Sequence, residues 1–168
     1  CFERLVMDEN GLFPQVEISS NHGMAPLKGA GKYPTYIACN MFCDRDVTYV
    51  PWSGWMDDSF QKITQEGGDG NENYGYIANM RPGNSVGFKY FECKGVKSMS
   101  VTTKGYATGP LQLRTAWDGE VLCEFIMDYA NVWREYTADV EIPDGVQALY
   151  FTFAGEGYLQ FAEFAFNN

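Results

Sequence analysis

The chain has 168 residues, of which 45% are hydrophobic and 20% are charged, and its formal net charge is −10. This length and composition are typical of one folded globular domain with a single substantial core. The surplus of carboxylates disfavours a nucleic-acid backbone or an anionic membrane surface as a partner, and no apolar run reaches the roughly 18–20 residues of a membrane span. A neutral or cationic partner fits the charge, although surface solvation explains the surplus equally well.

The first part of the chain differs in character from the rest. A Gly-rich loop is expected over residues 19–32, followed by a strand pattern over residues 33–43. We interpret residues 1–45 as an N-terminal extension or linker whose strands pack on a module formed by residues 46–168. The chain begins with Cys1 rather than Met, which we interpret as the sign of a piece cut from a larger protein.

Turn signals and alternating hydrophobicity recur at short intervals beyond this segment. The strongest turn signals are Pro82-Gly83, Asp118-Gly119 and Pro143-Asp144-Gly145. The apolar positions that alternate with polar ones include Leu111, Leu113, Leu149, Phe151 and Phe153. Period-two alternation between closely spaced turns predicts an all-β domain, an antiparallel β-sandwich. Residues 122–135 allow a helix as an alternative, but their charges do not fall on one stripe.

The sequence shows no recognisable catalytic or zinc-binding constellation. The single histidine, His22, has no Gly-x-Ser-x-Gly elbow to partner it. The glycine-rich run at residues 67–70 lacks the Lys-Ser/Thr ending of a phosphate-binding loop. Cys39 and Cys43 have neither a second cysteine pair nor a nearby histidine, so a zinc site is not expected. We interpret the cysteines as small buried thiols.

Three further readings stay open, two of which use carboxylates. Glycoside hydrolysis needs only two acids, so a small β-sandwich glycosidase that uses residues such as Glu66 and Glu135 stays an alternative. A structural domain that docks on a catalytic partner and binds no glycan is another. Calcium is also bound by carboxylate and carbonyl oxygens, although the chain lacks the spacing of an EF-hand loop.

The aromatic residues give the sharper signal. Residues 135–142 alternate between charged or polar side chains at odd numbers and Tyr, Ala, Val and Ile at even numbers. Trp133 shares the parity of the charged set, so we expect its indole to face outward, unless it covers a loop as a lid on the core. An exposed indole needs an apolar partner, and the C–H face of a sugar ring offers one. Tyr76 is a similar candidate, with a core tyrosine as the alternative.

The other tryptophans fit less well. Trp52 and Trp55 are weaker candidates for a sugar platform. Trp117 shares the parity of Leu111 and Leu113, so we expect it to pack in the core.

The stretch YGYIANMRPGNSVGFKYF (residues 74–91) resembles a strand pair of family 6 carbohydrate-binding modules. The pieces LRTAWDGE, NVWREYTADVEIPDGVQALYFTFAGEG and LQFAEFAF follow in the order of that family. The chain is most similar to the modules fused behind family 43 glycoside hydrolases of bacteria that degrade plant cell walls. The resemblance implies a jelly-roll, galactose-binding-like β-sandwich. It also implies a polysaccharide partner of the xylan or related β-glycan type, an appended hydrolase domain, and a position outside the cell or at its surface.

The resemblance also implies a non-catalytic site in which two aromatic rings face each other across a gap as wide as a pyranose. Tyr76 and Trp133 fall at the two ring positions. The acidic contact falls near Gln65 or Glu66, and Gln160 stands where the family has an Asn.

A structural calcium ion is common in the family, held by an early Glu and a late Asp. Here Glu17 is the early acid, and the late position reads Ala162 followed by Glu163.

Overall fold

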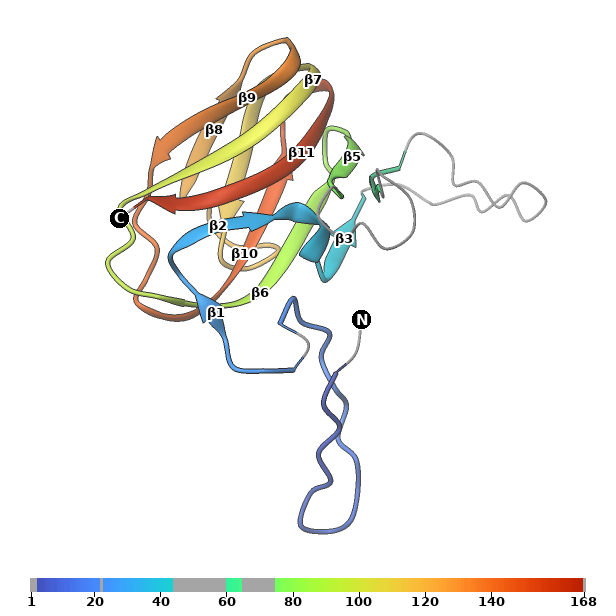
Figure 1. The fold of residues 1–168 in the computed structure, drawn as a ribbon. Coiled ribbons are helices and arrows are strands. Elements are labelled where there is room, and N and C mark those ends of the chain that lie inside the picture. Colours follow the sequence, from blue (N-terminus) through green and yellow to red (C-terminus); the bar gives the residue numbers. More distant parts are fainter. Residues whose placement is uncertain (1–2, 22, 44–59, 65–74, 168) are drawn as a thin grey trace, which may run out of the picture.

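The structure, a computed structural model, describes residues 3–21, 23–43, 60–64 and 75–167 and is built almost entirely of strands (Figure 1). The strands are β1 (Leu27–Lys28), β2 (Gly31–Pro34), β3 (Asn40–Phe42), β4 (Lys62–Ile63), β5 (Ile77–Met80), β6 (Ser85–Cys93), β7 (Ser98–Arg114), β8 (Cys123–Met127), β9 (Ala130–Asp139), β10 (Gly145–Phe153) and β11 (Glu156–Asn167). A short 3-10 helix, η1 (Thr35–Ile37), lies between β2 and β3. Among the described residues, no helix has the length and apolar character needed to cross a membrane.

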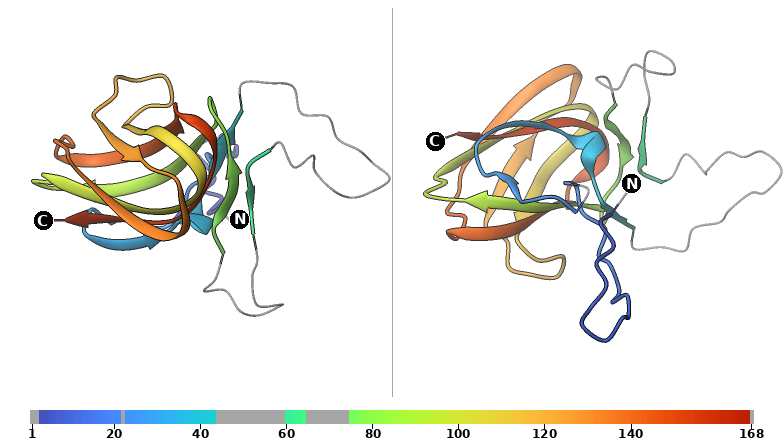
Figure 2. Two further views of the ribbon diagram at one scale, coloured as in Figure 1. Left: turned by 90° about the horizontal axis from the view of Figure 1, so that it is seen from above. Right: turned by 60° about the horizontal axis from the view of Figure 1, so that its bottom comes forward.

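The strands form two sheets that share β7. In sheet A, β6 pairs with β10, β10 with the C-terminal part of β7, and β7 with β8, while β1 and β3 also pair with β6. In sheet B, β9 pairs with the N-terminal part of β7, β7 with β11, β11 with β2 and β5, and β5 with β4. Figure 2 shows the strands curled around a common interior. The predicted all-β, antiparallel sandwich of jelly-roll type is confirmed.

The core lies between the two sheets and consists mainly of phenylalanines. Phe88 and Phe151 of sheet A meet Phe161 and Phe164 of sheet B, with ring centroids 4.8 Å apart for Phe88–Phe164 and 5.1 Å for Phe151–Phe161. All four side chains are less than 2% exposed. Burying each such ring stabilises the fold by roughly 1.5–3 kcal/mol, so these contacts hold the sheets face to face.

The alternation in the sequence is confirmed where strands form. Leu111 and Leu113 of β7 are fully buried, whereas the intervening Gln112 is partly exposed. Residues 122–135 contain β8 and the first part of β9, so the helix alternative is wrong.

The expectation that Trp117 packs in the core is also wrong. β7 ends at Arg114, so the strand parity does not extend to Trp117, which is 55% exposed in the following turn. Its ring lies against Phe42 instead, with centroids 5.0 Å apart.

The N-terminal segment contributes in two ways. Strands β1, β2 and β3 join the sheets through β6 and β11, so these residues of the predicted extension belong to the sandwich. Residues 3–18 lie outside both sheets and project away from them (Figure 1). The sandwich therefore begins at β1, before the boundary at residue 46 expected from the sequence.

Candidate functional site

Tyr76 is fixed at the entry to β5 by backbone contacts. Its carbonyl accepts a hydrogen bond from the N–H of Thr64 (2.9 Å), and its own N–H donates to the Thr64 hydroxyl (3.3 Å). The buried Thr35 hydroxyl accepts from the N–H of the next residue, Ile77 (3.2 Å), and donates to the carbonyl of Phe161. Thr35 therefore links β5 to β11 at the residue that follows Tyr76.

Asn79 shows how the sequence shapes β5 locally. Its φ of 59° lies in the left-handed region, which Asn tolerates better than other residues that carry a side chain. The pairing of β5 with β11 shifts register at the same place, and the Asn79 amide donates to the Phe60 carbonyl (3.2 Å). The Ile-x-Asn pattern of the sequence therefore marks an irregularity in β5 that lies three residues after Tyr76.

Trp133 lies on the outward side of β9. This strand pairs with β7, and its residues from Val132 to Glu135 are exposed, with Trp133 itself 41% exposed. The expectation that the indole points away from the core is confirmed. A large apolar face in partial contact with water, on the outer surface of a sheet, marks a candidate binding surface.

The structure brings Tyr76 and Trp133 together, but without the gap expected from the sequence. Their ring centroids are 5.2 Å apart and the planes cross at 76°, an edge-to-face contact. A sugar held between two ring faces needs two van der Waals separations of about 3.5–4.0 Å each, hence roughly 7–8 Å in all. The rings therefore touch each other directly, and the predicted pyranose-wide gap is wrong for this arrangement.

Lys104 joins the two rings from β7. Its ammonium lies 4.5 Å from the centroid of the Trp133 ring and 5.6 Å from that of Tyr76. Such cation–π contacts stabilise exposed rings by about 0.5–1 kcal/mol each. Lys104 is thus a member of the site that the sequence did not single out, because a lysine at an outward strand position looks like ordinary surface.

Gln160 lies directly across from Lys104 in the ladder between β11 and β7. Directly paired residues present their side chains on the same face of a sheet, so Gln160 belongs to the surface that carries Lys104. Its side-chain oxygen is buried and has no hydrogen-bond partner among the described residues. The amide oxygen is therefore an unsatisfied acceptor on the same face of the sheet as Lys104.

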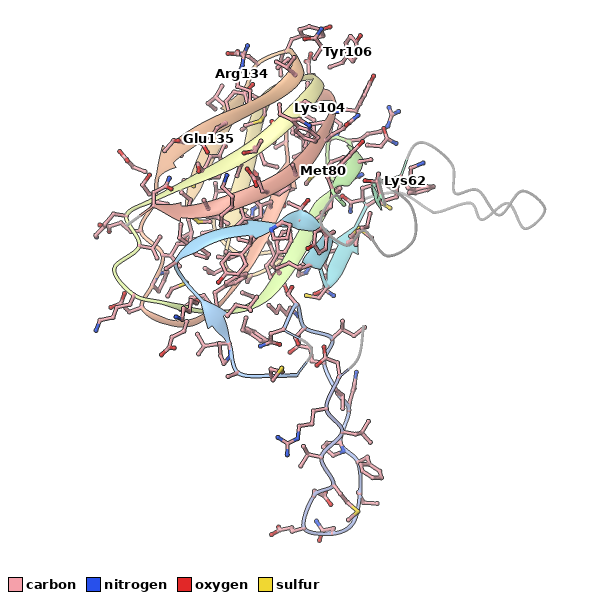
Figure 3. The ribbon with its side chains drawn as sticks, in the orientation of Figure 1. Lys62, Met80, Lys104, Tyr106, Arg134 and Glu135 are labelled. Carbon is pink, nitrogen blue, oxygen red and sulfur yellow. The ribbon has the colours of Figure 1, made fainter. Side chains whose placement is uncertain are left out.

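Three tyrosines extend this surface: Tyr106 on β7, Tyr158 on β11, and Tyr129 in the turn between β8 and β9. Tyr106 pairs with Tyr158 one step beyond Lys104 and Gln160, and its ring contacts those of Tyr158 (5.6 Å) and Tyr129 (4.9 Å). Gly157 lets the backbones of β11 and β7 lie close together here, because a Cβ there would lie 1.8 Å from the Tyr106 carbonyl oxygen. Figure 3 shows Lys104 and Tyr106 near one end of the sheet, with Arg134 and Glu135 on β9 beside them.

Other predicted site residues are not placed here. Gln65 and Glu66, like Trp52 and Trp55, lie outside the described residues. Glu135 is exposed and pairs with Thr102, but without Glu66 the two-carboxylate alternative stays a prediction.

The two acids predicted to hold calcium have separate partners. Glu17 binds Lys89 and Tyr90 of β6, and these hydrogen bonds hold the pKa of its carboxyl below the ordinary value. Glu163, on β11, forms an ion pair with Lys32 at 2.7 Å. Within the described ranges, no three His, Cys, Asp or Glu side chains are grouped so as to hold a metal ion. Glu17 and Glu163 thus do not fit a shared calcium site, and calcium stays a prediction.

The expectation of small buried thiols holds for Cys93, whereas Cys39, Cys43 and Cys123 are partly exposed. Cys93 is buried, and burial raises its pKa to about 11. Burial likewise raises the pKa of Cys123 to about 12, so neither thiol is primed for nucleophilic chemistry.

The clearest hollows lie away from the aromatic rings. One of about 370 Å³ is lined by Lys28, Glu92, Lys94 and Asp144, and another of about 540 Å³ by Lys97, Leu122 and Glu141. Neither includes Tyr76, Trp133 or Lys104. We favour the aromatic surface as the candidate site, because these hollows lack aromatic rings and their charged rims are ordinary surface.

Comparisons with known proteins place this geometry in context. No protein-family model matches the chain. A family 6 carbohydrate-binding module from Clostridium stercorarium, solved in complex with cellobiose, superposes with a TM-score of 0.64 at 15% identity, over 86% of this chain and 98% of that one. The chain has the fold of the family 6 carbohydrate-binding modules. The resemblance drawn from the sequence is thus confirmed at the level of the fold.

Two larger proteins contain a similar unit. A family 43 arabinoxylan arabinofuranohydrolase from Bacillus subtilis superposes on this family 6 fold with a TM-score of 0.64 at 16% identity, over 99% of this chain and 33% of that one. A "Xylosidase/arabinosidase" from Thermoclostridium stercorarium is 47% identical over 159 residues, which are 94% of this chain and 34% of that protein. The chain therefore spans about a third of the length of the curated relative it matches.

Proposed function

We propose that the chain is a non-catalytic module that binds plant cell-wall polysaccharide, of the xylan or a related β-glycan type, and targets an appended glycoside hydrolase. The observation that carries the proposal is the half-exposed Trp133 in contact with Tyr76 and Lys104, on a fold shared with a module solved with cellobiose. The choice of xylan follows the similarity to a xylosidase/arabinosidase and to an arabinoxylan arabinofuranohydrolase.

The sugar stacks on the exposed part of the Trp133 ring. Because Tyr76 touches Trp133 edge to face, the tyrosine holds the indole in place instead of forming the second wall of a sandwich. Gln160, on the same face as Lys104, supplies an amide oxygen that accepts no hydrogen bond from the described residues. Sugar hydroxyls can donate to and accept from an amide, so stacking and hydrogen bonding act on the same ligand.

The tyrosines Tyr106, Tyr129 and Tyr158 extend this surface along the sheet. Their rings and hydroxyls suit a neutral polymer better than an anionic one in a chain with a net charge of −10. An open surface with a few stacking and hydrogen-bonding groups predicts weak binding, with a Kd on the order of micromolar to millimolar.

The test is titration calorimetry of xylo-oligosaccharides with Trp133→Ala and with the matched control Val132→Ala, the exposed neighbour on β9. We expect Trp133→Ala to weaken binding at least about tenfold, or about 1.4 kcal/mol. The melting temperature should fall by only a few degrees, because the contacts with Tyr76 and Lys104 are lost while the fold is kept. Val132→Ala should bind like the parent. Unchanged affinity in Trp133→Ala would exclude the site.

A second assay separates binding from hydrolysis. The purified chain is incubated with a polysaccharide panel, and new reducing ends are measured. Their appearance, and their loss in Glu135→Gln, would favour the glycosidase alternative over the binding module.

A further inference from the structure

Residues 3–18, here named the arm, expose six large apolar side chains on a segment that belongs to neither sheet. The arm carries Leu5 (59% exposed), Val6 (57%), Met7 (58%), Leu12 (65%), Phe13 (60%) and Ile18 (49%). In Figure 1 the arm folds back on itself and hangs away from the sandwich. Single exposed apolar residues are normal, but six within one projecting segment mark a contact surface.

The backbone of the arm is also open. At its tip, the N–H of Asp8 donates to the carbonyl of Leu12 (2.8 Å) and that of Gly11 donates to Asp8 (3.1 Å). Within the described residues, no further backbone hydrogen bond joins the two limbs that lead away from this turn. The limbs therefore present unpaired N–H and C=O groups, which can pair with the edge of another sheet.

The base of the arm is firmly attached to the sandwich. The Glu3 carboxylate accepts hydrogen bonds from the N–H (2.7 Å) and hydroxyl (2.9 Å) of Ser19. The N–H of Ser20 donates to the carbonyl of Lys89 (2.6 Å), and the N–H of Lys89 donates to the Ser20 hydroxyl (3.1 Å). Because its base is anchored and its tip is uncovered, the arm can contact another surface at a fixed position relative to the sandwich.

We propose that the arm docks on the glycoside hydrolase domain of the same longer protein, inserting its apolar side chains and pairing its backbone with that domain. This inference rests on the appended hydrolase of the proposed function. The choice of partner follows from how much of this chain two known structures match. The isolated Clostridium stercorarium module matches 86% of this chain, whereas the Bacillus subtilis hydrolase, which is three times longer than the matched region, matches 99%. Because 99% coverage leaves out only about two of the 168 residues, the arm has a counterpart in a protein that carries a hydrolase.

The proposal specifies the chemistry of the docking surface. Leu12 and Phe13 at the tip require an apolar groove, and the limbs require a strand edge beside it. The docked arm would be buried on both sides, which explains why Leu5, Val6 and Met7 are all apolar although consecutive strand residues point in opposite directions.

The experiment measures amide hydrogen exchange of the arm in the full-length protein and in the 168-residue chain. We expect the limb amides to exchange at least about a hundredfold more slowly in the full-length protein, because docking buries their hydrogen bonds. The double substitution Leu12→Asp and Phe13→Asp should abolish this protection in the full-length protein. Ile126→Asp, on an equally exposed residue of β8, is the matched control and should leave the arm protected.

The outcomes separate this inference from the proposed function. Equal exchange of the arm in both proteins would overturn docking, whatever the module binds. Protection that depends on protein concentration in the 168-residue chain would show a second copy as the occupant and overturn it too. An arm protected in the full-length protein while sugar titration fails would overturn the proposed sugar binding alone. The melting temperature of the substituted 168-residue chain should not change, because the arm lies outside both sheets.

Discussion

Lys104 and Gln160 face each other directly across β7 and β11, and the Lys104 ammonium reaches from this pair to the ring of Trp133 at 4.5 Å. The pair thus lies on the sheet surface next to the indole of Trp133. Lys104 makes cation–π contacts with the two rings, whereas the amide oxygen of Gln160 has no hydrogen-bond partner among the described residues. The two residues should therefore respond differently to substitution.

Lys104→Ala should weaken oligosaccharide binding about two- to fivefold, which corresponds to the 0.5–1 kcal/mol of an exposed cation–π contact. Without the ammonium, the indole is less well fixed before the sugar arrives. Titration calorimetry measures the change, and Lys97→Ala, which removes an exposed lysine paired with Glu141, is the control. Tighter binding in Lys104→Ala would instead mean that the ammonium competes with the sugar for the ring.

Gln160→Leu should raise stability while lowering affinity. An unsatisfied buried polar group costs about 1–3 kcal/mol, and leucine removes that cost with a similar volume. The same change removes the amide that would bond the sugar, so affinity should fall about tenfold. Urea unfolding and calorimetry give the two values. A loss of stability would show that the amide is satisfied by water.

Thr35→Val should destabilise the fold by about 1–3 kcal/mol, because it leaves the buried N–H of Ile77 without its acceptor. The ring of Tyr76, one residue earlier, should also lose its fixed direction. Urea unfolding reports the first effect, and the near-ultraviolet circular dichroism of the Tyr76–Trp133 pair reports the second. Thr152→Val in sheet A, whose hydroxyl bonds that of Ser85, is the comparison that should spare the ring signal.

The attachment of the arm should weaken in acid. Hydrogen bonds from Lys89 and Tyr90 lower the pKa of Glu17 from its ordinary value of 4.5. Its contribution is therefore fully present above pH 4.5 and is lost as the pH falls through the lower, folded-state value. The protection factor of the Ser20 amide, which bonds to the Lys89 carbonyl, should fall in that range once the intrinsic slowing of exchange at lower pH is divided out.

Glu17→Gln should remove this acid dependence, whereas Glu141→Gln, which alters an exposed pair elsewhere, should retain it. An identical pH profile in the parent and Glu17→Gln would show that the ion pair does not hold the base of the arm.

The fold was largely predictable because its signals are local. Alternation at Leu111 and Leu113 is imposed by the pleat, and the turn at Pro82-Gly83 ends β5 where the sequence indicated. Trp117 was misjudged because parity carries no information once the strand has ended at Arg114.

The site was predictable only in part. The parity of Trp133 indicated an outward indole, and the family resemblance supplied Tyr76 as its neighbour. The contact between them depends on how β9 and β5 curve toward each other across β7 and β11, which no local pattern encodes. Lys104 escaped notice for the same reason, since its partners come from two other strands.

The length of β7 has one further consequence. A single strand supplies Lys104 to the aromatic surface and Leu111 and Leu113 to the interior of the opposite sheet. Neither half of the sandwich can melt while the other keeps all its strands. Loss of glycan affinity on heating should therefore coincide with unfolding of the whole domain. Glycan binding measured against temperature would then report the unfolding transition.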